Sequence, residues 1–274
     1  MTAPVLARDR SGRRYVWPPK GPSELVVPSV TTILGQLSKP ALTNWAAKAV
    51  ATYAAENMDA WQNLPPSDAI DLLKRAPYRN MTKRQNIGSA VHTAIESWQG
   101  GEPVVEDLDL LPYVAAAVGF LDGHTTELLE QEATVFSRQY LYAGTLDAIV
   151  TLKDGRTVIV DWKTGKAIYP EAALQLCAYA NAEFVGTADG TEHPLPEIDL
   201  GIVVHLKDDG TYVAREVEFS TRMFKTFVAL RTVQLWRDDH EQHALGETRR
   251  GPDKKEADSA AGNTDGRVVR LRPA

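Results

Sequence analysis

The chain has 274 residues, and 43% of them are apolar, which excludes collagen-like and low-complexity proteins. Its single cysteine excludes disulfide-stapled proteins and any four-cysteine metal site. We expect a cytoplasmic protein, since reducing conditions suit one free thiol and no apolar run approaches the ~20 residues of a membrane span. The net charge of −6 is uneven, because residues 21–244 hold 18 basic and 30 acidic residues, and this acidic body argues against binding nucleic acid by bulk electrostatics.

The first half of the chain predicts a short extended region followed by helices. Residues 13–28 place apolar pairs on both sides of a Pro/Gly turn, which is typical of two short strands. Apolar periodicity, prolines at helix starts and a Thr-Lys-Arg-Gln capping box then predict helices. These cover residues 29–37, 40–56, 66–75, 82–99 and 110–129, the last with a break near 122–123.

From Ala133 onward the apolar period changes to two, which is typical of strands. The predicted strands cover residues 133–141, 144–152, 156–163, 199–206 and 211–219, and the helices cover 170–184 and 221–240. This order predicts an α/β (α+β) protein. We expect an N-terminal extended arm and helical region over 1–130, a core domain over 131–244 and a flexible tail over 245–274.

The stretch from Gly144 to Lys166 carries the strongest chemical signal. Side chains alternate along a strand, so Asp161 and Lys163 share a face and the residue between them points away. A two-residue turn in the hairpin would place Asp147 opposite that intervening residue. We predict instead a three-residue loop with Gly155 in the left-handed conformation, which places Asp147 opposite Asp161 and puts Leu146 on the face of Trp162.

Two opposed carboxylates on a buried sheet repel each other unless a proton or a cation lies between them. A divalent cation is the simpler answer, and oxygen ligands favour Mg²⁺ or Mn²⁺, with Mn²⁺ preferred if an imidazole joins. Lys163 can then orient or deprotonate water, or stabilise a phosphate under attack. A plain hairpin with solvent-facing charges is the alternative, but the apolar run 158–160 leads directly into Asp161.

Several other polar side chains fit the same site. Gln175 and Tyr179 lie one turn apart on a helix, and Arg84, His92 and Glu96 follow one edge of another helix. Each also has a structural interpretation, as a helix flank or a packed side chain. Phosphate contacts are predicted for Arg84 and Lys166, whereas Glu96 and Glu132 are interpreted as surface carboxylates rather than outer metal ligands. The remaining histidines, including His205, show no ligand spacing.

Four motifs occur in a fixed order along the chain. They are G-x-x-x-H (88–92), G-T-L-D (144–147), V-D-W-K (160–163) and Q-x-x-x-Y (175–179). Together they resemble the PD-(D/E)xK nucleases and are most similar to the RecB-like exonuclease branch, which includes CRISPR-associated adaptation exonucleases and phage nucleases. The resemblance implies a restriction-endonuclease-like mixed sheet flanked by helices, and metal-dependent hydrolysis of DNA without a covalent intermediate.

Carried over residue by residue, the resemblance implies a metal site and a catalytic lysine. His92, Asp147, Asp161 and the backbone carbonyl of Trp162 would bind Mg²⁺ or Mn²⁺, and Asp147, Asp161 and Lys163 would be catalytic. DNA contacts would come from Gln175, Tyr179, Arg84 and Lys166. The chain departs from cluster-bearing members of the branch, because one cysteine cannot hold their iron–sulfur cluster.

The leading functional hypothesis is a DNA exonuclease that acts in recombination, repair or phage DNA processing. A structure-specific endonuclease and a catalytically inactive DNA-binding module are the alternatives, and the second is disfavoured because Asp147, Asp161 and Lys163 are all present. A serine hydrolase is disfavoured because no G-x-S-x-G motif occurs. The expected partner is DNA, and the C-terminal V-V-R-L-R-P segment is a weaker candidate for docking on a recombination or replication partner.

Overall fold

A computed structural model describes residues 5–9, 12–20, 22, 25–78, 81–101 and 107–248. The chain divides after Leu235 into two compact units. The second unit holds the end of α7 (Thr221–Asp239) and the short helix η3 (Glu241–His243), with an ion pair of 3.7 Å between Arg237 and Glu241. Most of the predicted tail, residues 249–274, lies outside the described residues.

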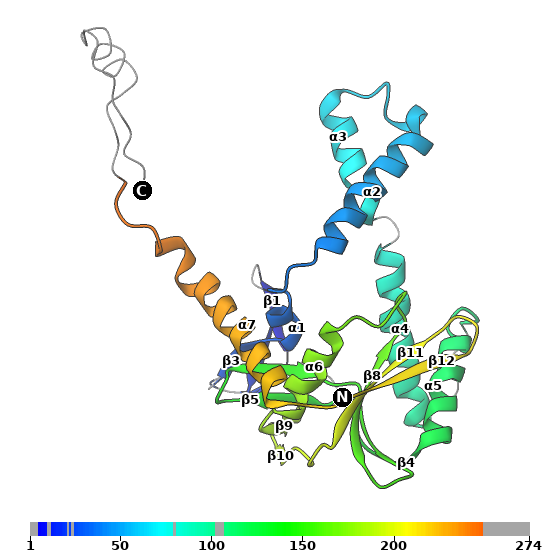
Figure 1. The fold of residues 1–274 in the computed structure, drawn as a ribbon, viewed down its shortest axis with the longest axis vertical. Helices are drawn as coiled ribbons and strands as arrows, with labels where there is room; N and C mark the ends of the chain where they lie inside the picture. Colours follow the sequence, from blue (N-terminus) through cyan, green and yellow to red (C-terminus); the bar gives the residue numbers. More distant parts are fainter. Residues whose placement is uncertain are drawn as a thin grey trace, which may run out of the picture. The chain divides into compact units, whose positions relative to one another are not determined.

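A five-stranded sheet forms the centre of the first unit (Figure 1). Its strands, in spatial order, are β12 (Tyr212–Val217), β11 (Leu200–Leu206), β8 (Thr157–Lys163), β7 (Ala148–Leu152) and β4 (Thr125–Gln131). Strands β8 and β11 are parallel and the other neighbours are antiparallel, so the sheet is mixed. Nearly continuous apolar runs in β8 and β11 fit their burial on both faces. The predicted fold class is confirmed.

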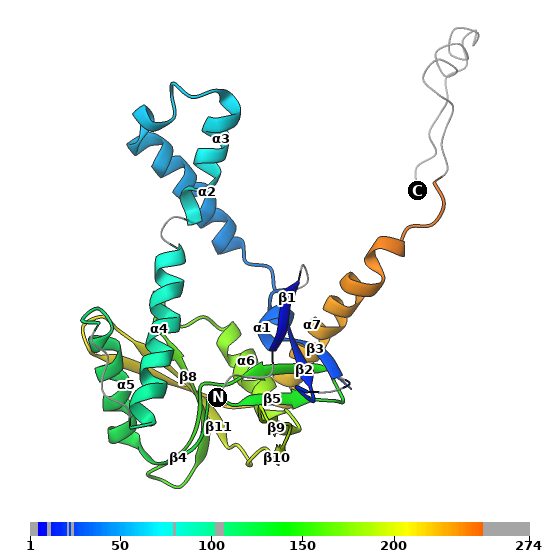
Figure 2. The same cartoon turned by 180° about the vertical axis from the view of Figure 1, so that it is seen from behind.

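Helices cover both faces of this sheet (Figures 1 and 2). On one face α4 (Met81–Gln99) and α5 (Leu111–His124) pack over a core that includes Phe120 and Val160. On the other face α1 (Val30–Leu34), α6 (Glu171–Ala180) and the first part of α7 pack over a second core that includes Ile159 and Phe227. Helix α1 begins as predicted, because Ser29 Oγ accepts the Thr32 N–H at 3.0 Å.

Two smaller sheets complete the unit. One contains β10 (Glu192–Pro194), β9 (Phe184–Gly186), β5 (Thr134–Ser137) and β6 (Tyr142–Thr145). The other contains β1 (Val5–Asp9), β2 (Gly12–Trp17) and β3 (Leu25–Pro28). An aromatic core that includes Trp17, Phe136 and Phe184 joins the two, with ring centroids 5.2–5.5 Å apart. The extended pieces predicted over 13–28 are confirmed as β2 and β3.

Between α1 and α4 the chain forms a helical segment with few buried side chains. It contains α2 (Pro40–Glu56), η1 (Met58–Ala60), α3 (Pro66–Lys74) and η2 (Ala76–Tyr78). Prolines begin both longer helices, as predicted, because a first-turn proline needs no amide hydrogen. No helix among the described ranges is long and apolar enough to cross a membrane.

The helix predicted over 110–129 is wrong in its second half. Helix α5 ends at His124, where Lys153 Nζ binds the carbonyls of Asp122 and Gly123 at 2.7 and 3.0 Å. Residues from Thr125 onward form β4, which pairs with β7 at the edge of the central sheet. Pairing with a distant strand therefore outweighs the local helical pattern.

Three predicted elements near the site are shorter than expected. Strand β5 ends at Ser137 and the helix predicted to reach 184 ends at Ala180. The strand predicted over 144–152 divides into β6 and β7, which belong to different sheets. Because the chain crosses from one sheet to the next at residues 146–147, the strand alternation stops there and the side chain of Asp147 is free to face the site.

Candidate metal and catalytic site

The hairpin between β7 and β8 has the predicted register. Ala148 pairs with Val160, and Gly155 takes a φ of +90° in a loop closed by the Leu152 N–H and the Arg156 carbonyl at 2.8 Å. The same register extended by one residue sets Asp147 beside Asp161. Asp147 Oδ2 accepts a hydrogen bond from the backbone N–H of Trp162 at 2.7 Å. The side-chain carboxylate therefore replaces a backbone carbonyl as the acceptor at this point of the strand pair.

The predicted position of Leu146 is wrong. Leu146 packs in the core of Ile149 and Ile159, whereas Trp162 packs in the core on the other face of the sheet. The reason is the break between β6 and β7, because strand alternation does not continue through residues 146–147.

A chain of hydrogen bonds runs from Asp161 to α6. Asp161 Oδ1 accepts from Lys163 Nζ at 2.7 Å and from Gln175 Nε2 at 3.2 Å, and Gln175 Nε2 also donates to the Tyr179 hydroxyl at 3.1 Å. The Asp161 side chain is only 2% exposed. Its second oxygen, Oδ2, is buried and has no hydrogen-bond partner among the described residues. A buried carboxylate oxygen without a partner is costly and indicates a missing ligand.

Gly144 leaves the space that the Tyr179 ring occupies, since a Cβ at residue 144 would lie 2.4 Å from Tyr179 Cε1. We expect Gly144→Ala to displace this ring, break the Gln175–Tyr179 contact and destabilise the protein by about 1–3 kcal/mol. Thermal denaturation measures the loss of stability. The control is Gly246→Ala, because a Cβ at residue 246 would lie in open space. Gly190→Ala is unsuitable as a control, because residue 190 has a positive φ and alanine would itself be strained there. Equal melting temperatures for Gly144→Ala and the wild type would contradict the expectation.

His92 on α4 lies between Asp147 and the backbone of Trp162. Its Nε2 lies 3.1 Å from the carbonyl oxygen of Trp162, and its Nδ1 lies 3.4 Å from Asp147 Oδ1. The ring therefore lies between two of the predicted metal ligands. Gly88, one turn earlier, lies next to the turn after β8, where a Cβ would make an ordinary contact with Thr164 Oγ1 at 3.4 Å.

Glu132 joins the site although the sequence suggested a surface carboxylate. Its Oε1 lies 3.8 Å from His92 Nδ1, and His92, Glu132 and Asp147 each offer one ligand atom, all within 4.8 Å of one another, so the three could hold a metal ion. Its backbone has a positive φ of 45°, and its N–H donates to the carbonyl of Asp147 at 2.9 Å. Glutamate rarely adopts this conformation, so the turn between β4 and β5 places it here at a cost in strain. No local pattern in the sequence signals this geometry.

The charges in the site are unbalanced. Burial lowers the pKa of His92, but Asp147 and Glu132 outweigh it and raise the pKa to about 11. Burial alone would raise the pKa of Asp147, but His92 and Lys163 lower it. Burial raises the pKa of Asp161 to about 6, although Lys163 acts in the opposite direction. Three carboxylates thus face one imidazole and one ammonium group, and a further cation would relieve the negative excess.

The donor set fits a hard divalent cation. The unpartnered Asp161 Oδ2, the Asp147 carboxylate and the Trp162 carbonyl are oxygen ligands, and His92 adds one nitrogen. Oxygen ligands with a single imidazole suit Mn²⁺ or Mg²⁺. The residues predicted from the sequence therefore fit the metal, and Glu132 lies next to them.

The remaining residues that the sequence connects with the site lie outside the group of metal-ligand candidates. Lys166 is exposed in the turn that follows β8, and Glu96 lies on α4 outside the group formed by His92, Glu132 and Asp147. Arg84 belongs to α4, but the side chains of residues 81–86 lie outside the described part of the structure.

We expect Glu132→Gln to weaken Mn²⁺ binding about 10–100-fold, the range typical of carboxylates that orient a metal-ligating histidine. Isothermal titration calorimetry with Mn²⁺ measures the change in Kd. Glu127→Gln on the exposed edge of β4 is the matched control, since it removes the same charge away from His92. An unchanged Kd in Glu132→Gln would show that Glu132 does not act on the metal.

Comparison with known proteins gives matches among solved structures. No protein-family model and no curated protein matches the sequence. The chain is similar to the crystal structure of SSO0001, with 14% identity, 77% of this chain and 83% of that chain covered, and a TM-score of 0.33. It is also similar to an alkaline exonuclease, LHK-Exo, from Laribacter hongkongensis, with 13% identity, 63% and 86% covered, and a TM-score of 0.34. The structure of LHK-Exo in complex with dAMP has 12% identity, with 63% of this chain and 86% of that chain covered, and a TM-score of 0.33.

Proposed function

We propose that this protein is an Mg²⁺- or Mn²⁺-dependent deoxyribonuclease, and specifically an exonuclease that hydrolyses phosphodiester bonds of linear DNA. The observation that carries the proposal is the convergence of Asp147, Asp161 and Lys163 with His92 at the end of one hairpin. The buried and unpartnered oxygen of Asp161 supports a cation there. The motif resemblance supplies the substrate class and agrees with a role in recombination, repair or phage DNA processing.

Each side chain has a role that follows from its position. His92, Asp147, Asp161 and the Trp162 carbonyl would hold the cation, which supplies Lewis acidity toward the phosphate and lowers the pKa of water. Lys163 is one-third exposed at its side chain, so its ammonium group can reach a substrate oxygen while Asp161 Oδ1 holds it at 2.7 Å. A fixed ammonium group next to a phosphate stabilises the charge that develops during attack.

Residues on α6 position this lysine. Gln175 Nε2 shares the Asp161 Oδ1 atom with Lys163 Nζ, so it limits rotation of the carboxylate. Tyr179 is buried, and burial raises the pKa of its hydroxyl well above the usual value, so the group stays neutral beside the carboxylates. A neutral hydroxyl adds no negative charge where a phosphate would bind.

Digestion of labelled DNA tests the proposal. We expect release of short products from linear single- or double-stranded DNA with Mn²⁺ or Mg²⁺, no activity in EDTA, and resistance of covalently closed circular DNA. Cleavage of circular DNA would favour the structure-specific endonuclease instead. DNA binding without cleavage in both Mn²⁺ and Mg²⁺ would favour the inactive DNA-binding module. Activity that persists in EDTA would contradict the proposed metal-dependent mechanism.

A further inference from the structure

A pocket of about 430 Å³ opens where β8 and β11 end, next to the candidate site. Its lining includes Thr164 and Lys166 from the turn after β8, and His205 and Lys207 from the end of β11. Of these four residues, only Lys166 is predicted from the sequence to contact a phosphate. Strand β11 joins β8 through a long connection, so nothing in the local sequence places these two chain ends together.

The pocket adjoins the catalytic lysine through the sheet register. His205 pairs with Lys163 and Val203 pairs with Asp161 on the parallel strands β11 and β8. Register partners on parallel strands present side chains to the same face, so His205 lies beside Lys163. His205 Nε2 donates to the carbonyl of Gly165 at 2.5 Å and thereby holds the turn that carries Lys166.

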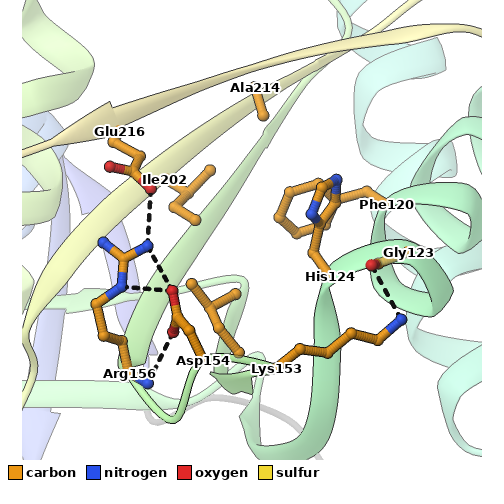
Figure 3. Close-up of a pocket in the computed structure, with 10 residues that line it drawn as sticks. Phe120, Gly123, His124, Lys153, Asp154, Arg156, Ile202, Ala214 and Glu216 are labelled. Carbon is orange, nitrogen blue, oxygen red and sulfur yellow. Dashed lines mark hydrogen bonds and ion pairs between the residues drawn. The ribbon is translucent and has the colours of Figure 1, made fainter.

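The charge in this pocket differs from the charge in the other described pockets. Two lysines, Lys166 and Lys207, line it against one carboxylate, Asp208. Asp209, outside the lining, also interacts electrostatically with Lys207, but neither lysine forms an ion pair with a described residue. A pocket of about 350 Å³ at the opposite end of the hairpin offers a contrast (Figure 3). There Arg156 is held by Asp154 and Glu216, so its guanidinium group is already neutralised.

The other basic side chain of the pocket at the opposite end of the hairpin, Lys153, also has hydrogen-bond partners. Lys153 Nζ binds the carbonyls of Asp122 and Gly123 at the end of α5, as Figure 3 shows for Gly123. A further pocket of about 570 Å³ beside β4 is lined by Asp122 and Glu127 and by no lysine or arginine. Among these pockets, the one beside Lys163 is therefore the one suited to an anion.

We propose that the pocket lined by Lys166, His205 and Lys207 binds a phosphate group of the DNA strand that the neighbouring site cleaves. This inference rests on the proposed nuclease function and adds a substrate-binding subsite to it. Ammonium groups on Lys166 and Lys207 would pair with phosphate oxygens, and the Thr164 hydroxyl can donate a further hydrogen bond. The phosphate is either terminal or internal, and both forms offer the same anionic oxygens.

The test measures binding of fluorescent oligonucleotides in Ca²⁺, under which cleavage is expected to be too slow to interfere. We expect Lys207→Ala to raise Kd about tenfold, and to lower the slope of log Kd against log salt by about 0.7–0.9, the value for one phosphate contact. Lys207→Arg should bind nearly as the wild type does, because it keeps the charge. Lys225→Ala on the exposed side of α7 removes one lysine elsewhere and should leave Kd unchanged.

Different oligonucleotides identify the phosphate. If it is terminal, the effect of Lys207→Ala appears only with a 5′- or a 3′-phosphate and disappears with hydroxyl ends. If it is internal, the effect persists with hydroxyl ends and disappears when one neutral methylphosphonate replaces the contacted position. Either pattern supports the subsite.

Two results would overturn the subsite. One is an unchanged Kd and salt slope in Lys207→Ala for every oligonucleotide, and the other is an equal loss in Lys225→Ala. A parallel digestion with Mn²⁺ separates this failure from failure of the nuclease proposal. Wild-type cleavage combined with an unaffected Lys207→Ala would reject the subsite alone, whereas a wild-type protein that neither binds nor cleaves DNA would reject both.

Discussion

Lys163→Ala is expected to lower kcat for DNA hydrolysis about 10³-fold. The ammonium group lies 2.7 Å from Asp161 Oδ1 and is the one cation that the hairpin itself supplies to the site. Removal of one preorganised donor to a developing oxyanion typically costs about 10²–10³ in kcat. Steady-state cleavage of a labelled linear duplex with Mn²⁺ measures the effect.

Two controls separate catalysis from folding in this experiment. Lys225→Ala removes a lysine from the exposed side of α7 and should cleave DNA at the wild-type rate. The melting temperature of Lys163→Ala should fall, because the buried Asp161 carboxylate loses its ammonium partner, so the measurement must show that the variant is still folded at the assay temperature. Full activity in Lys163→Ala would rule out its catalytic role.

Mn²⁺ is expected to raise the melting temperature of the wild-type protein by about 5–10 °C at 100 times its Kd. A ligand at that concentration that binds only the folded state adds about 2.7 kcal/mol of stability, and each kcal/mol shifts Tm by about 2–4 °C in a domain of this size. Asp147→Asn should abolish the shift, since it removes the charge of a carboxylate that faces both His92 and Trp162. Differential scanning fluorimetry with and without EDTA measures it.

The matched control for the metal experiment lies at the other end of the same hairpin. Asp154 is an exposed loop residue paired with Arg156, so Asp154→Asn should retain the Mn²⁺-induced shift. Similar shifts in wild type and Asp147→Asn would place the metal, if one binds, outside the proposed site. A shift absent even from the wild type would contradict the metal proposal.

Local physical chemistry explains why the sequence predicted the hairpin. Gly155 can adopt the positive φ that a three-residue loop needs, and that loop length sets the register that brings Asp147 beside Asp161. Strand alternation places Asp161 and Lys163 on one face without reference to the rest of the molecule. The same local rules found the starts of α1 and α2 at a serine cap and a first-turn proline.

The local rules failed where distant segments meet. Residues 125–129 read as the end of a helix, yet pairing with β7 makes them part of the edge strand β4. Leu146 reads as a partner of Trp162, yet the crossing between two sheets turns it to the other core. Glu132 reads as a surface carboxylate, yet a positive φ turns it toward His92. Each of these outcomes depends on contacts that sequence periodicity does not encode.

The sequence by itself determined the composition limits, the mixed α/β class and the pairing of two aspartates with a lysine on one hairpin, because turn chemistry and side-chain alternation are local properties. The tertiary structure decided which groups surround them. It brought His92 from α4 and Glu132 from the end of β4 to one side of Asp147, and His205 from β11 to the side of Lys163. Those neighbours follow from helix packing and parallel strand pairing over long stretches of chain, which only the folded molecule specifies.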